Sequence, residues 1–116
     1  QIDSVLLQKF AQVDTPAPLA SVISQAEQDN ARHWLRLTEE DWQSVLATLD
    51  SQQLFPLAVF FTLAEQQFSG WQCGARNPAI WIFRWLRQHD QLPDKEHIRA
   101  LKKMTDNRFI PYGSVL

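Results

Sequence analysis

Apolar side chains recur at helical spacing along most of this chain, and no segment alternates in the manner of a strand. The first helix is predicted over residues 3–13, where five apolar positions share one face: Ile2, Val5, Leu6, Phe10 and Val13. The prolines within residues 15–18 end it and start a second helix, whose apolar positions are Leu19, Val22, Ile23 and Ala26. The pattern leaves open whether this second helix continues to Trp34.

Local start signals place the next two helices. Thr38 is followed by Asp41 at the spacing of a capping box, in which each side chain bonds the other residue's backbone amide. The helix that follows this capping box has one apolar face, made of Trp42, Val45, Leu46 and Leu49. Pro56 suits the first turn of a helix, because a proline lacks the amide hydrogen that a helix start leaves unpaired. We therefore expect a fourth, nearly all-apolar helix from Pro56 to about Phe68.

The stretch Gly70–Gln88 holds three of the five tryptophans, the only cysteine and three arginines. Asn77 and Pro78 start a fifth helix there, with Asn77 as N-cap and Pro78 at the first helical position. This helix is apolar around most of its circumference as far as His89. We expect it at the centre of the domain, with Trp85 in the core.

A sixth helix is predicted after Pro93, with Asp94 as N-cap, and it ends at residues 106–107. Its inward apolar positions are Ile98, Leu101 and Met104. The tail, residues 108–116, carries five apolar side chains. We expect such a tail to pack back onto the bundle through Phe109 or Tyr112.

These elements predict an all-α fold, a compact single-domain bundle of five to six helices with a packed C-terminal tail, over residues 1–116. A hydrophobic share of 45% with 21% charged residues is typical of a globular domain and not of a disordered one. The chain begins at Gln1 rather than Met, which is compatible with a fragment of a longer protein. We expect no secretory signal and no membrane association, because the longest apolar run, residues 54–63, is too short to cross a bilayer.

A single cysteine cannot form an internal disulfide, so we expect a reducing, cytoplasmic environment. The net charge is −2, but residues 1–70 carry three basic side chains against nine acidic ones, and residues 71–116 carry eight against four. Such asymmetry can indicate an anionic partner for the basic half. We favour the reading in which the two halves face each other within one fold or across a homodimer.

The candidate catalytic groups form no recognisable constellation. Cys73 lies near the helix start at Asn77, but no nucleophile motif surrounds it, and a lone cysteine beside glycine is usually a small buried side chain. The three histidines stand at no metal-binding spacing: His33, His89 and His97. Three glycines provide no phosphate-binding loop. We therefore predict no catalytic residues, no cofactor and no metal, and a thiol enzyme at Cys73 ranks third among the functional hypotheses.

Four basic side chains gather on the predicted sixth helix. Lys95, Arg99 and Lys102 follow one another at i, i+4 and i+7, and Lys103 flanks them. The fifth helix, the short turn after it and the basic sixth helix together have the outline of a helix-turn-helix, a motif that docks on phosphates. A pI near 5.9 argues against nucleic acid as the partner.

Tryptophan, tyrosine and arginine dominate binding hot spots. Five such residues lie on or before the fifth helix: Trp71, Arg76, Trp81, Arg84 and Arg87. Trp71 is predicted on a loop and Trp81 at the edge of the apolar face. We expect these five side chains to form an exposed surface that binds a protein partner.

The sequence thus favours a non-catalytic protein–protein interaction domain: an adaptor, accessory or inhibitory subunit that docks its partner through this aromatic/arginine surface. The alternative is a nucleic-acid-binding helical domain that uses the basic strip on the helix at about 94–105. Salt distinguishes the two, because phosphate binding weakens steeply with ionic strength and an aromatic-anchored interface weakens little.

Overall fold

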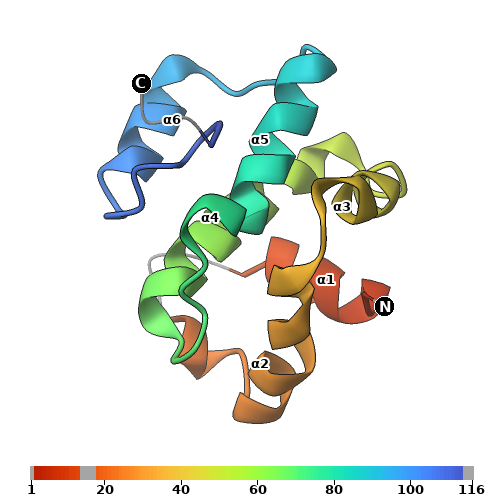
Figure 1. The fold of residues 1–116 in the computed structure, drawn as a ribbon, viewed down its shortest axis with the longest axis vertical. Helices are drawn as coiled ribbons and strands as arrows, with labels where there is room; N and C mark the ends of the chain where they lie inside the picture. Colours follow the sequence, from red (N-terminus) through yellow and green to blue (C-terminus); the bar gives the residue numbers. More distant parts are fainter. Residues whose placement is uncertain (1, 14–17, 114–116) are drawn as a thin grey trace.

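Figure 1 traces the described chain, residues 2–13 and 18–113 of this computed structural model. Its α-helices are α1 (Ser4–Ala11), α2 (Gln25–Arg32), α3 (Glu39–Leu46), α4 (Ser51–Gln67), α5 (Pro78–Gln88) and α6 (Lys95–Lys102). Short 3₁₀ helices lie between them: η1 (Leu19–Ser21), η2 (His33–Arg36) and η3 (Gly74–Arg76). The described residues contain no strand, and the Cα radius of gyration of 13.0 Å is about that of a compact domain of this size. The predicted all-α bundle is confirmed.

Side-chain caps begin most of these helices. The predicted capping box is present: Thr38 Oγ1 accepts from the Asp41 amide at 3.1 Å, and Asp41 accepts from the Thr38 amide at 3.0 Å. Asn77 caps α5 as predicted, because its Oδ1 accepts from the Ala79 amide at 2.8 Å. Asp94 precedes α6, but its side chain makes no capping hydrogen bond.

The second helix is not the continuous one that the apolar spacing predicted. The chain makes only the short η1 and then restarts at Ser24, which forms a capping box with Glu27. Lys9 holds the Glu27 carboxylate from α1 at 2.8 Å, so this restart is tied to a neighbouring helix. Ala26, expected on the apolar face, is consequently exposed. Helical structure does continue past Trp34, as η2.

The prediction that Pro56 opens the fourth helix is wrong. α4 begins at Ser51, where Asp50 and Gln53 form a capping box, and Pro56 lies inside the helix. The extra turn buries Leu54, which is 1% exposed. Cap and burial together offset the lost amide of an interior proline. Pro56 itself is exposed.

The core lies around α4, which packs along α5 and α1, while α3 packs on α5 (Figure 1). Seven aromatic side chains in it are at most 1% exposed: Phe10, Trp34, Trp42, Phe60, Phe61, Trp71 and Phe83. The Phe10 ring stacks on Phe60 with centroids 4.1 Å apart, which joins α1 to α4. No described helix has the length and apolarity needed to cross a membrane.

Two residues that the sequence predicts in the core are not buried. Trp85 is only partly buried, and its ring stacks on His89 with centroids 4.1 Å apart. Met104 is 51% exposed because α6 ends before it, at Lys102, so the inward face of that helix is set by Leu101.

The tail packs on the bundle as predicted, as far as the structure describes it. Phe109 and Tyr112 lie against the core, and Arg84 Nε of α5 donates to the Tyr112 carbonyl oxygen at 3.0 Å. Residues 114–116, which the same prediction covered, lie outside the described residues.

Candidate functional site

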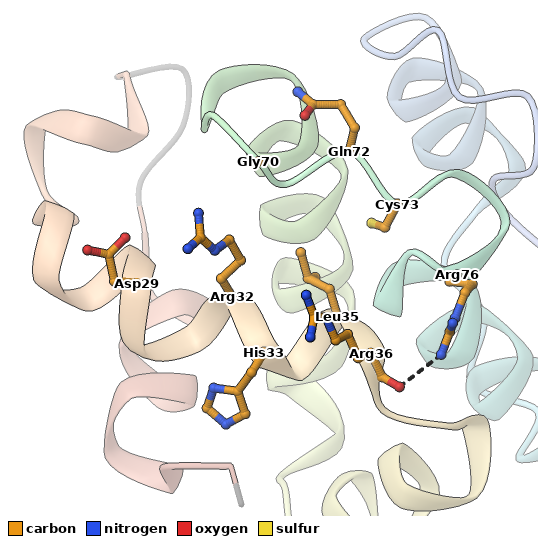
Figure 2. Close-up of a pocket in the computed structure, with 9 residues that line it drawn as sticks. All are labelled: Asp29, Arg32, His33, Leu35, Arg36, Gly70, Gln72, Cys73 and Arg76. Carbon is orange, nitrogen blue, oxygen red and sulfur yellow. Dashed lines mark hydrogen bonds between the residues drawn. The ribbon is translucent and has the colours of Figure 1, made fainter.

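A groove of about 740 Å³ lies between the segment 29–36, formed by α2 and η2, and the loop 70–76 (Figure 2). Three arginines from these two segments line it: Arg32, Arg36 and Arg76. We call this feature the arginine groove. Its other titratable lining side chains are Asp29, His33 and Cys73.

Core packing of α2 and η2 sets the positions of Arg32 and Arg36. Ala31, Trp34 and Leu35 are buried, so the helical backbone turns the residues between them outward. Arg32, the last residue of α2, and Arg36, in η2, are both exposed, and both line the groove.

The opposite wall of the groove is the loop from Gly70 to Arg76. Gly70 has φ +80°, and a Cβ there would lie 3.1 Å from Arg32 Nη1, so this glycine leaves room for the guanidinium. Trp71 anchors the loop in the core, with its ring centroid 5.2 Å from that of Phe68. Arg76 Nη2 donates to the Arg36 carbonyl oxygen at 2.8 Å, which spans the groove between its walls (Figure 2).

The carboxylate of Glu65 on α4 holds this loop from behind. Its Oε2 accepts from the amides of Cys73 and Gly74, both at 2.8 Å. Its Oε1 accepts from the side-chain amides of Asn77 at 3.0 Å and Asn107 at 2.8 Å. Glu65 is 8% exposed, so four uncharged donors satisfy a buried carboxylate and join α4, the loop and the C-terminal segment.

None of the three groove arginines forms an ion pair within the described residues. Their two ion pairs are Lys9 with Glu27 and Arg84 with Glu39, each at 2.8 Å, and neither involves a groove arginine. Asp29, the one acidic lining residue, accepts a hydrogen bond from Gln25 at 3.0 Å. The groove is therefore suited to an anion.

Cys73 lies half-buried at the wall of the arginine groove (Figure 2). Burial, followed by the nearby Glu65 carboxylate, raises the pKa of its thiol to about 12, against a smaller opposite effect of Arg76. The thiol therefore stays protonated at neutral pH, whereas a nucleophilic cysteine needs a lowered pKa.

The five predicted partner-binding residues do not form one surface. Trp71 is 1% exposed, so the expectation of an exposed loop tryptophan is wrong; its ring fits among the phenylalanines of α4 and its C-cap. Arg76 lines the arginine groove. The other three, Trp81, Arg84 and Arg87, belong to α5.

Those three side chains make internal contacts between α5, α3 and the tail. The guanidinium carbon of Arg84 lies 5.2 Å from the Trp81 ring centroid, and its Nη1 pairs with Glu39 at 2.8 Å. The guanidinium carbon of Arg87 lies 4.2 Å from the Tyr112 ring centroid. Arg84 and Arg87 therefore help to hold the tail on α5.

The basic strip of α6 is present as predicted. Its four side chains are all exposed: Lys95, Arg99, Lys102 and Lys103. α6 lies at the end of the molecule away from α2, so the strip and the arginine groove are separate surfaces (Figure 1).

Sequence reasoning missed Arg32 and Arg36. The available signal was their spacing of four residues. Both arginines belong to the acidic half of the chain, where two basic side chains do not indicate a basic site. Nothing local indicated that Arg76 would face them across a groove.

Among the described residues, no three histidine, cysteine, aspartate or glutamate side chains are grouped so as to hold a metal ion. Comparison of the chain with family models, curated proteins and solved structures finds no match. Its function is therefore inferred from the geometry of the arginine groove.

Proposed function

We propose that this chain is a non-catalytic protein–protein interaction domain, an adaptor, accessory or inhibitory subunit, which docks an acidic segment of its partner in the arginine groove. The observation that carries the proposal is the convergence of Arg32, Arg36 and Arg76 on one groove without a described carboxylate paired to them. Guanidinium groups bind carboxylates through paired hydrogen bonds, which gives such a site both affinity and orientation.

Two further features support this function. The protonated thiol of Cys73 favours a structural cysteine and not a nucleophile. A lone cysteine forms no internal disulfide, which is compatible with the reducing, cytoplasmic location that we propose.

The test is a titration of the full chain against a fluorescein-labelled oligo-glutamate peptide at physiological salt, followed by fluorescence anisotropy. Arg32→Gln with Arg36→Gln should weaken binding at least about tenfold, a loss of about 1.4 kcal/mol. The matched control is Arg99→Gln with Lys102→Gln, which removes the same charge from an exposed site on α6. It should change affinity by less than about threefold, because charges beyond a Debye length are screened.

Absence of peptide binding would overturn the proposal. Equal losses in the two double variants would also overturn it, since they would indicate attraction to overall charge and not to the groove.

The second candidate is nucleic-acid binding by the basic strip of α6. It is favoured by the exposure of all four basic side chains: Lys95, Arg99, Lys102 and Lys103. In this case a labelled duplex DNA should bind in the micromolar range at physiological salt, with log affinity falling linearly as log salt rises. The α6 double variant should then abolish DNA binding, while the groove variant should not.

A further inference from the structure

The arginine groove carries more positive charge than one carboxylate requires. Each guanidinium of Arg32, Arg36 and Arg76 offers five N–H donors in a planar fork. A carboxylate has one negative charge and is matched by a single guanidinium in a bidentate pair. A phosphate monoester carries about −1.5 to −2 charges at neutral pH and three terminal oxygens, which suits a groove lined by three arginines.

The arrangement of the arginines also favours a multiply charged ligand. Arg32 and Arg36 line the same groove, and like charges that share one site repel. A dianion lying between them would replace this repulsion by attraction. Asp29, the acidic residue of the described lining, offsets one of the three positive charges, so the lining keeps a net positive charge.

One of the three guanidinium groups is held by a hydrogen bond within the protein. Arg76 Nη2 is held at 2.8 Å by the Arg36 carbonyl oxygen, which leaves the other N–H groups of that guanidinium for an anion. Arg32 lies against Gly70, where a Cβ would approach its Nη1 to 3.1 Å. Such preorganisation reduces the entropy lost on binding.

We propose that the segment docked in the arginine groove carries a phosphate monoester, as phosphoserine or phosphothreonine, and that Arg32, Arg36 and Arg76 bind its terminal oxygens. The inference rests on the proposed function, because both place a partner segment in the same groove. It adds the chemical class of the group that this segment presents.

The test uses three labelled oligo-glutamate peptides that differ only at one central residue: serine, phosphoserine or glutamate. Anisotropy titrations of the full chain should give the tightest binding for phosphoserine, about tenfold tighter than for glutamate. The serine peptide should bind most weakly.

A charge-conserving variant distinguishes the contribution of the paired hydrogen bonds to affinity from the contribution of the charge. Arg32→Lys with Arg36→Lys keeps both charges but loses both forks. It should weaken binding of both the glutamate and the phosphoserine peptide, and that of the phosphoserine peptide more, so that most of the gain from phosphorylation is lost. The matched control, Arg99→Lys on α6, should leave that gain unchanged.

Equal affinity of the unchanged protein for the phosphoserine and glutamate peptides would overturn the phosphate assignment and leave the proposed function standing. Failure of all three peptides to bind would overturn both. Inorganic phosphate, added as a competitor, should displace the phosphoserine peptide only at millimolar concentration. Displacement at micromolar concentration would assign the groove to free phosphate and overturn a partner-borne group.

Discussion

At the residue scale, Glu65 is the side chain on which the geometry of the loop depends. Its carboxylate is buried on α4, yet no lysine or arginine pairs with it among the described ion pairs. Two backbone amides and two asparagine side chains donate to it. One buried acceptor thus fixes the turn between Trp71 and Asn77, and with it the wall that carries Arg76.

Glu65→Ala should lower the free energy of unfolding by at least about 3 kcal/mol, because four donors lose their acceptor inside the protein. Denaturant titration measures this change. Gln52→Ala, at an exposed position of the same helix, is the control and should cost less than about 1 kcal/mol. A loss below 1 kcal/mol for Glu65→Ala would mean that the described network contributes little to stability.

Cys73 should react slowly with iodoacetamide at neutral pH. Its thiol pKa is raised to about 12 by burial and by Glu65, so the reactive thiolate is scarce until the pH approaches that value. Mass spectrometry of timed samples should show a labelling rate that increases with pH up to the limit of the folded state. Labelling at neutral pH as fast as that of a free thiol would contradict this assignment.

At the scale of elements, α4 shows how packing overrides a local stop signal. Pro56 is the sixth residue of the helix and cannot donate a backbone hydrogen bond there. The Asp50 and Gln53 capping box and the burial of Leu54 place the helix start a full turn before it. The helix continues through the proline to Gln67.

Pro56→Ala should raise the free energy of unfolding by about 1–3 kcal/mol, since it restores an amide donor within the helix, less the entropy that proline removes from the unfolded chain. The readout is the midpoint of a denaturant titration. Pro93→Ala, in the loop before α6, is the matched control and should not be stabilising, because no helical hydrogen bond is gained there. A fall in stability for Pro56→Ala would show that the proline is needed where it stands.

At the scale of the whole molecule, the tail closes over α5 through Arg84. This side chain pairs with Glu39 of α3 and donates to the carbonyl oxygen of Tyr112. Gly113 beside it has φ +84°, a backbone conformation that favours glycine, and a Cβ there would displace the guanidinium because it would lie 2.6 Å from Arg84 Nη2. Three segments distant in sequence therefore meet at one guanidinium.

Arg84→Gln should release this closure and accelerate amide hydrogen exchange at Ile110 and Gly113, whose amides bond Asn107 and Phe109. Exchange in α1 should not change. Lys102→Gln is the control, because that exposed side chain takes no part in the contact with the tail. Unchanged exchange at Gly113 in Arg84→Gln would show that the apolar contacts alone hold the tail.

The α-helical class and most helix starts follow from the sequence alone. Helical spacing of apolar residues and side-chain caps act within a few residues, so Thr38 with Asp41, and Asn77 with Pro78, could be placed without knowing the fold. The packing of Phe109 and Tyr112 was also predictable, because so apolar a tail is unfavourable in water.

Only the tertiary structure decided the candidate site. Whether Trp71 is exposed depends on the rings of Phe61 and Phe68, which α4 brings to it. Arg32 and Arg36 meet Arg76 because Glu65 and Trp71 fix the loop opposite them. The width of the groove is a distance between two segments that lie far apart in the sequence. The packing of α4 and the burial of one carboxylate set that distance, and local sequence pattern does not.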